Sequence, residues 1–216
     1  KVVPRPNVRK LLRGKGQFVD DLKLPRMVHA VFLRSPHAHA AIKAIDVVEA
    51  SGMPGVIAVL TGADYASDGL GSITGPSPYQ RRDGSTMFRP SRPALTSDRA
   101  RHVGQIVAMV VAETVEQAKD AAEAVQIDYD PLPVNVVTES ARKSTAIWGD
   151  CPDNESFFYQ VGDKEAVDSA VAGAAHVIQQ RYVINRITAN AMEPRGALAE
   201  WDPGTERYTI YTGVQR

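Results

Sequence analysis

Residues 105–133 read QIVAMVVAETVEQAKDAAEAVQIDYDPLP, and this stretch decides the fold class. The run 105–112 is short, apolar and rich in β-branched residues, which predicts a buried strand. Thr114 followed by Gln117 is a capping-box pattern, and the helical spacing of apolar residues over 115–125 predicts a helix. Residues 125–129 predict a second strand, which ends at the Asp-Pro-Leu-Pro sequence 130–133. This strand–helix–strand unit predicts a layered α+β domain that includes the strands before it.

Strands and turns are predicted on both sides of this unit. Residues 27–33 and 56–60 are strand-like, with a turn at 52–55 between them, and residues 69–93 form a long loop rich in Gly, Pro and Ser. Beyond the unit we expect a connection over 131–154 and a short helix from Asp163 to Ala174. Strands at 177–187, 197–201 and 207–214, with a turn at 202–205, then predict antiparallel pairing in a second, incomplete domain.

The composition excludes several classes of protein. The 216 residues include 25 basic and 25 acidic side chains, so the sequence has no electrostatic signature of nucleic-acid or anionic-membrane binding. The longest apolar run is far shorter than the roughly 20 residues that a membrane span needs. Cys151 is the single cysteine, so this chain cannot form an internal disulfide or ligate an iron–sulfur cluster by itself. The chain starts at Lys1 and stops after a strand-like run, so we expect a piece of a longer polypeptide.

Candidate chemical residues are few, and each has a plainer structural interpretation. His37 and His39 can share one face of a strand and bind a metal, but no further ligand accompanies them, so we predict that neither is a ligand. We interpret Cys151 as a loop thiol and not as a nucleophile. The remaining candidates are carboxylates beside turns and a charged pair at a strand junction, for which turn bonds and an ion pair are favoured: Asp20, Asp21, Asp128, Asp130, and Glu193 with Arg195.

Several longer segments resemble the large, molybdenum-cofactor-binding subunit of the xanthine dehydrogenase and aldehyde oxidase family, including carbon-monoxide-dehydrogenase-like members. The resemblance runs over essentially the whole chain, through LLRGKGQFVDDLKLPRMVHAVFLRSPHAHAAI (11–42), PGVIAVLTGAD (54–64), RHVGQIVAMVVAET (101–114), AKDAAEAVQIDYDPLP (118–133) and NAMEPRGALAEWD (190–202). It implies an a/b hammerhead domain over residues 1–140, a linker over 141–154 and the first antiparallel strands of a molybdopterin-binding domain over 155–216.

The same resemblance implies an oxidoreductase that hydroxylates a carbon centre, with water as the oxygen source, at a molybdenum held by a molybdopterin dinucleotide. Iron–sulfur clusters and FAD would reside on a small and a medium partner subunit, in a cytoplasmic dimer of heterotrimers without nucleic acid or a membrane span. Carbon monoxide, an aldehyde and an N-heterocycle all stay open as substrates. The MEPRG sequence at 192–196 is closer to carbon-monoxide-dehydrogenase-like enzymes and to bacterial enzymes acting on heterocycles or aldehydes.

Gln215 is the one residue of this chain that matches a family residue approaching the molybdenum. The family usually has Ser-Thr-Gln there, so Gly213 and Val214 depart from the pattern while Gln215 is kept. The other cofactor-binding segments and the catalytic base of the family lie beyond Arg216. We therefore expect no catalytic residue, no metal ligand, no tightly bound molybdenum and no turnover in the 216-residue chain alone. The alternative hypotheses are a non-catalytic module that docks subunits and a stand-alone domain with a new role.

Overall fold

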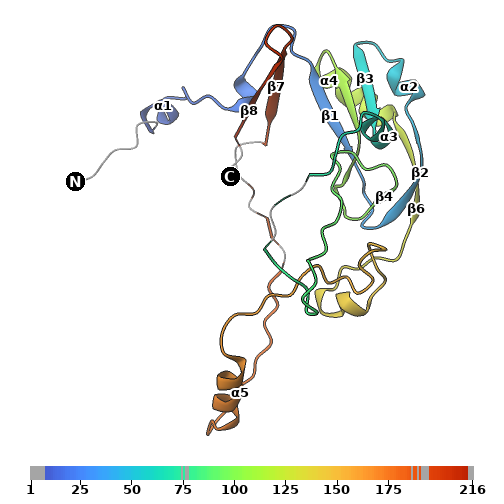
Figure 1. Ribbon diagram of the computed structural model, residues 1–216. Coiled ribbons are helices and arrows are strands. Elements are labelled where there is room, and N and C mark those ends of the chain that lie inside the picture. Colours follow the sequence, from blue (N-terminus) through green and yellow to red (C-terminus); the bar gives the residue numbers. More distant parts are fainter. Residues whose placement is uncertain are drawn as a thin grey trace. The chain divides into compact units, whose positions relative to one another are not determined.

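The computed structural model describes residues 8–73, 75, 78–185, 187–188, 190 and 195–213. These residues form two compact units, one of residues 28–172 and one that joins the beginning of the chain to residues from Gly173 onward. Both units contain helices and antiparallel strands (Figure 1), which confirms the predicted α+β class. No helix in the described residues is long and apolar enough to cross a membrane.

The larger unit is built around strand β5. This strand, Ile106–Ala112, is central in a three-stranded sheet and pairs antiparallel with β1 (His29–Arg34) and β3 (Val56–Thr61). A second antiparallel sheet has the order β4 (Arg99–Ala100), β2 (Ala40–Asp46), β6 (Gln126–Pro131). The predicted strand–helix–strand unit is confirmed, and its two strands belong to different sheets.

Helix α4, Val115–Ala124, connects the two sheets and begins as the sequence predicts. The Thr114 hydroxyl accepts a hydrogen bond from the Gln117 backbone N–H (3.2 Å), and the Gln117 amide oxygen accepts one from the Thr114 N–H (3.1 Å). These reciprocal bonds satisfy two backbone donors that the first turn of a helix leaves free. The capping box therefore fixes where the chain turns from β5 into α4.

The hydrophobic core lies between α4 and the strands. Its buried centre includes Val110 of β5 with Ala118 and Ala121 of α4, while Ile45 of β2 and Ile127 of β6 pack against them partly buried. The small side chains of Ala118 and Ala121 let α4 approach the strands closely. One core thus joins both sheets, as expected for a single layered domain.

Short helices and loops complete this unit. They are α2 (Val48–Ser51), α3 (Gly62–Ser67), the 3-10 helix η2 (Thr138–Lys143) and α5 (Lys164–Ala172). The turn before β3 contains Gly55 at φ +77°, a left-handed conformation that favours glycine. Asp163 caps α5 as predicted, because its Oδ1 accepts the backbone N–H of Ala166 at 2.9 Å. The loop predicted over 69–93 contains no helix or extended strand among its described residues.

The smaller unit contains α1 (Val8–Leu12), the 3-10 helix η1 (Val19–Asp21) and a hairpin of β7 (Ala197–Asp202) and β8 (Arg207–Thr212). The hairpin register, Ala197 opposite Thr212 and Asp202 opposite Arg207, confirms the predicted turn. Just before β7, Gly196 packs closely against η1. A Cβ at this position would lie 2.6 Å from a carboxylate oxygen of Asp20, so a larger residue would force that side chain to move.

The strand predicted over 177–187 is wrong: its described residues belong to no strand. Their large apolar side chains are exposed instead, Ile178 at 93% and Val183 at 73%. The β-branched composition favours a strand, but a strand is stable only with a hydrogen-bonded neighbour, and none of the described residues pairs with this segment.

Candidate functional site

The predicted cofactor contact, Gln215, lies outside the described residues, as do Glu193 and Pro194. Arg195 is described and exposed. Strand β8 leads toward Gln215 and is exposed along its whole length, and Trp201 packs against Tyr208 across the hairpin with ring centroids 4.4 Å apart. None of the described residues of this smaller unit is buried, so they do not by themselves form a site that fits a molybdopterin cofactor.

His37 and His39 are placed at the end of the second sheet and serve different contacts. His39 is 3% exposed, and its Nδ1–H donates to the Pro133 carbonyl oxygen at 2.7 Å. Its own carbonyl oxygen accepts the Leu132 N–H at 2.9 Å. The His37 ring instead packs on the ring of Tyr129 at 4.9 Å, and burial raises the pKa of that tyrosine.

The role of His39 follows from the sequence that it contacts. Pro131 and Pro133 have no backbone N–H, so Leu132 supplies the single backbone donor of the Pro-Leu-Pro segment. His39 binds that donor and a neighbouring acceptor, which extends the pairing of β2 and β6 past a proline. These two hydrogen bonds join His39 to the backbone of residues 132–133.

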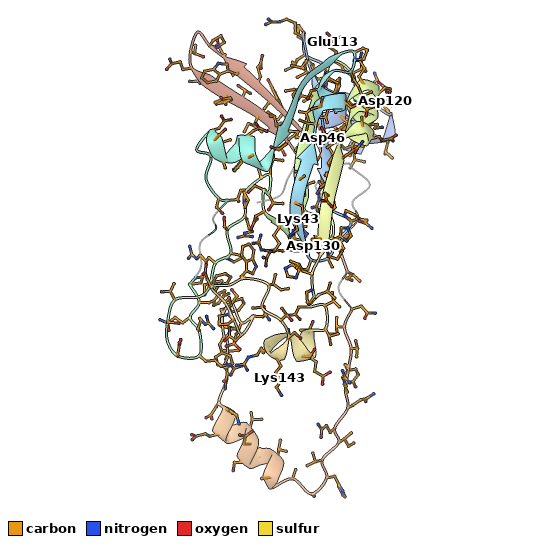
Figure 2. All side chains as sticks on the ribbon, turned by 90° about the vertical axis from the view of Figure 1, so that its right-hand side faces the viewer. Lys43, Asp46, Glu113, Asp120, Asp130 and Lys143 are labelled. Atoms are coloured by element: carbon orange, nitrogen blue, oxygen red, sulfur yellow. The ribbon has the colours of Figure 1, made fainter. Side chains whose placement is uncertain are left out.

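The paired carboxylates point to structural roles. Asp21 accepts the backbone N–H of Phe18 at 2.9 Å, as a turn residue does. Asp130 forms an ion pair with Lys43 at 3.3 Å across β2 and β6 (Figure 2). Asp128 and Asp130 are both exposed on β6, in a solvent environment in which ion pairs contribute little.

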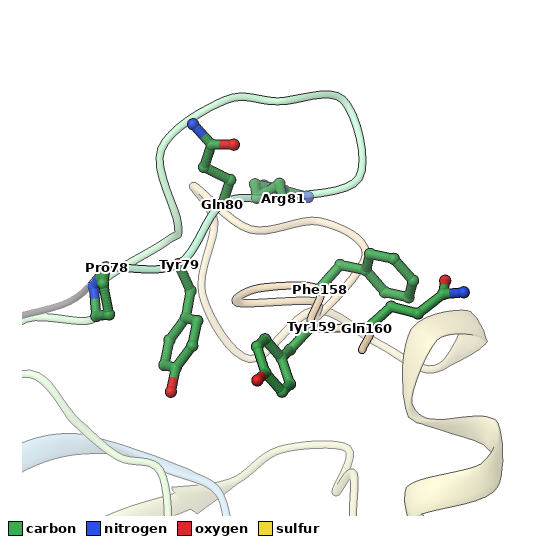
Figure 3. A pocket seen from close by; sticks show the side chains of 7 residues that line it. All are labelled: Pro78, Tyr79, Gln80, Arg81, Phe158, Tyr159 and Gln160. Atoms are coloured by element: carbon green, nitrogen blue, oxygen red, sulfur yellow. The ribbon is translucent and has the colours of Figure 1, made fainter. Parts of the chain in front are cut away.

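An open pocket of about 510 Å³ lies between two segments of the larger unit (Figure 3). One wall is Pro78–Arg81 of the long loop and the other is Phe158–Gln160. Tyr79 stacks on Phe157 with centroids 4.8 Å apart and meets Tyr159 edge-on at 5.5 Å. Backbone bonds join the two walls, since the Phe158 N–H donates to the Gln80 carbonyl oxygen at 2.9 Å.

Ion pairs tie the same two segments together. Both carboxylate oxygens of Asp153 accept from Arg81 Nη2, at 2.7 and 2.6 Å. The hydrogen bond to Asp153 raises the pKa of Arg81. The pKa of Asp153 is lowered, mainly by its hydrogen bond from the Glu155 backbone N–H and also by Arg81. Glu155 in turn accepts from Arg82 at 3.2 Å and pairs with Arg142 at 3.0 Å. The charges in this region are therefore used to join loops.

Cys151 is buried inside this region, at 3% exposure. Its thiol is 3.6 Å from Asp153 Oδ1 and 3.5 Å from the Glu155 carbonyl oxygen, both possible acceptors. Burial, then the hydrogen bond to Asp153, raises the pKa of the Cys151 thiol. A raised pKa disfavours the reactive thiolate, which agrees with the interpretation of Cys151 as a loop thiol.

Sequence analysis missed the residues that organise this region. The guanidinium carbon of Arg101 lies over the Trp148 ring, 3.9 Å from the ring centroid. Asn154 has a left-handed φ of 54°. Asparagine tolerates that conformation better than most residues, so the Asp-Asn sequence at 153–154 was the available signal. Arginine–carboxylate pairs separated by about 70 residues leave no such signal.

The chain was compared with known proteins. The sequence model of the aldehyde oxidase and xanthine dehydrogenase a/b hammerhead domain matches residues 13–133, and that of the molybdopterin cofactor-binding domain matches 148–216. The nicotine 6-hydroxylase large subunit of Paenarthrobacter nicotinovorans is 34% identical over all of this chain and 26% of its own length. The carbon monoxide dehydrogenase large chain of Afipia carboxidovorans is 34% identical over 95% of this chain and 26% of its own.

A solved structure has a similar fold. Quinoline 2-oxidoreductase from Pseudomonas putida 86 superimposes with a TM-score of 0.83 and 33% identity, over 97% of this chain and 26% of that one. The chain thus spans about a quarter of the length of the relatives that it matches. Because the two domain models match in order and together cover most of its length, the chain belongs to the aldehyde oxidase and xanthine dehydrogenase family, through its hammerhead domain and the beginning of its molybdopterin cofactor-binding domain.

Proposed function

We propose that this chain is the hammerhead domain and the opening segment of the cofactor domain in the large subunit of a molybdenum hydroxylase. The observation that supports this most directly is the ordered pair of domain matches, 13–133 and 148–216. The relatives named as large subunits or large chains support partner subunits in general. We place the domain limits at residues 1–140 and 155–216, with 141–154 between them.

The proposed reaction is hydroxylation of a carbon centre with oxygen from water. A molybdopterin dinucleotide, when bound, would supply the oxidising metal, and iron–sulfur and FAD subunits would receive the electrons in a cytoplasmic dimer of heterotrimers. The described residues of this chain supply scaffold: the capped core domain and the joined loops. We propose Gln215 as this chain's own cofactor contact, because its amide donates a hydrogen bond without adding charge.

The test of the activity is an isotope experiment on the full enzyme. The large subunit is co-expressed with its neighbouring subunits, molybdenum is measured per protein, and the enzyme is assayed in H₂¹⁸O with an aldehyde, an N-heterocycle or carbon monoxide. One oxygen from H₂¹⁸O in a hydroxylated N-heterocycle, or molybdenum-dependent oxidation of the aldehyde or of carbon monoxide, supports the proposal. Bound molybdenum without turnover on any class, or no molybdenum at all, contradicts it and favours a docking module.

Gln215 is tested in the same enzyme. We expect Gln215→Ala to lower turnover per molybdenum roughly 10- to 100-fold, the effect of one lost preorganised donor of about 1–3 kcal/mol. Arg207→Ala, on exposed β8, is the matched control and should leave turnover unchanged. Normalising to molybdenum separates lost chemistry from lost cofactor. Unchanged turnover per molybdenum in Gln215→Ala would restrict Gln215 to the scaffold.

A further inference from the structure

The side chain of Asn154, near the start of the second domain match, forms hydrogen bonds to residues of the connection between the two domain matches. Its Nδ2 lies within donor distance of three carbonyl oxygens, and its Oδ1 accepts one backbone N–H. The partners are the oxygens of Ala141 (2.9 Å), Ser144 (3.2 Å) and Thr145 (3.2 Å) and the N–H of Ile147 (2.9 Å). The Ala141 oxygen also accepts from the Ser144 N–H at 3.3 Å and from Asn135 Nδ2 at 3.1 Å. The Asn154 amide thus adds a bond at the end of η2 and binds the irregular residues after it.

The backbone of Asn154 reverses the chain at the same point. Its φ of 54° is left-handed, and its N–H donates to the Cys151 carbonyl oxygen at 3.0 Å. Residues 148–154 therefore form a tight turn, in which Trp148 and Cys151 form an isolated antiparallel β-bridge. Asparagine combines tolerance of this backbone with a side chain that bonds locally, which glycine and aspartate each provide in part.

The residues on either side of Asn154 attach directly to the long loop. Asp153 binds Arg81 and Glu155 binds Arg82, as described above. Next, the Phe88 N–H donates to the Ser156 carbonyl oxygen at 2.9 Å, and the Ser156 hydroxyl donates to the Phe88 carbonyl oxygen at 2.7 Å. Phe158 continues these contacts through its bond to Gln80. Residues 153–158 are therefore attached to the long loop at several points, both before and after Asn154.

The pocket of Figure 3 depends on this tie, because its two walls come from different segments. Tyr79 belongs to the long loop, whereas Phe157 and Tyr159 follow the asparagine turn. Detaching residues 155–160 would separate the three rings and remove one wall. The pocket therefore requires residues 155–160 to stay attached to the long loop.

We infer that residues 141–160 form a buckle, that the Asn154 side chain is the positioning element which closes it, and that the aromatic pocket between 78–81 and 158–160 requires the closed buckle. These bonds join the long loop of the hammerhead segment to the start of the cofactor-domain segment, so residues 141–154 are not a free linker. The inference does not depend on the proposed enzymatic activity.

Three variants separate the amide from the left-handed backbone. Asn154→Gly keeps the backbone conformation and removes the side chain, and Asn154→Asp keeps an acceptor but points a carboxylate at three carbonyl oxygens. Asn154→Ala loses the amide and also disfavours the backbone conformation. Gly149→Ala is the matched control, because a Cβ there meets nothing within 4 Å and its φ is not left-handed.

Two readouts on the purified protein follow the buckle locally. The first is the alkylation rate of Cys151, quantified by mass spectrometry on its peptide, since this thiol is buried in the closed buckle. The second is hydrogen exchange over 78–92 and 155–160, which contain the bonded amides of Phe88 and Phe158. We expect Gly, Asp and Ala variants at position 154 all to raise both rates about 10-fold or more, and the control to match wild type.

Two results would overturn the inference. If Asn154→Gly behaves like wild type while Asn154→Ala opens the buckle, the backbone conformation alone acts and the amide does not close it. If strand β5 loses exchange protection together with the buckle, Asn154 maintains global stability and has no local positioning role.

Discussion

Strand β5 and the segment 177–187 both contain several β-branched residues but lie in different environments. Both are rich in Val and Ile, yet Val110 of β5 is fully buried whereas Ile178 is 93% exposed. The difference is that β5 has a hydrogen-bonded neighbour on each side and a helix across one face, while the described residues offer the other segment neither. Apolar, β-branched composition thus shows that a segment can be a central strand, and the neighbours decide whether it is one.

The largest expected effect tests this comparison directly. Val110→Ala should lower the free energy of unfolding by about 2–3 kcal/mol, because two methyl groups leave a close-packed site that cannot fully collapse. Val183→Ala, in the exposed segment, should change it by less than about 0.5 kcal/mol. Urea denaturation measures both. Equal losses would mean that the segment 177–187 is packed in the folded protein, which would break the comparison.

Backbone packing gives the next largest effect. A Cβ on Gly62 would lie 2.5 Å from backbone atoms of Thr96 and Ser97, which cannot move as a flexible side chain can. We expect Gly62→Ala to cost about 1–3 kcal/mol by overpacking. Gly71→Ala is the control in the long loop, where nothing lies within 4 Å, and should be neutral in thermal unfolding. A neutral Gly62→Ala would mean that this crossing relaxes easily.

Helix caps extend the comparison to a packed and an unpacked helix. Thr114→Ala removes the cap of α4, which packs on the core, and should lower global stability by about 1 kcal/mol. Asp163→Ala removes the cap of α5, whose residues are all exposed, so we expect fraying of α5 alone. Chemical denaturation reports the first and hydrogen exchange over 164–172 the second. A global loss in Asp163→Ala would show that α5 also supports the core.

The smallest effect is a response to acid confined to the buckle. The pKa of Asp153 is lowered in the folded protein, so its contribution is present above about pH 4 and is lost as the pH falls through the folded pKa. The fluorescence emission of Trp148, measured in a Trp201→Phe background, should therefore shift in wild type as the pH falls below about 4. Asp153→Asn should remove this part of the response, whereas Asp150→Asn, an exposed neighbour, should retain it.

The candidate site divides in the same way as the fold. Pro131 and Pro133 predict the end of β6 from the sequence. Nothing in the sequence shows that His39, more than 90 residues earlier, donates a hydrogen bond to the Pro133 carbonyl oxygen. Cys151 stays an interpretation as a loop thiol, with which its burial and raised thiol pKa agree. Gln215 stays a prediction, since it lies outside the described residues.

Local chemistry by itself determined the strands β1, β3, β5 and β6, the capped helix α4, the cap of α5 and the turn between β7 and β8. In each, the signal is a period of apolar residues or a side chain that bonds within three or four positions. Tertiary structure alone decided which sheet each strand joined, that 177–187 has no ladder partner among the described residues, and that Arg81, Arg82 and Asn154 fasten a loop to residues 141–160. The physical reason is distance along the chain: pairing between residues about 70 positions apart depends on how the whole chain packs, and no local pattern encodes it.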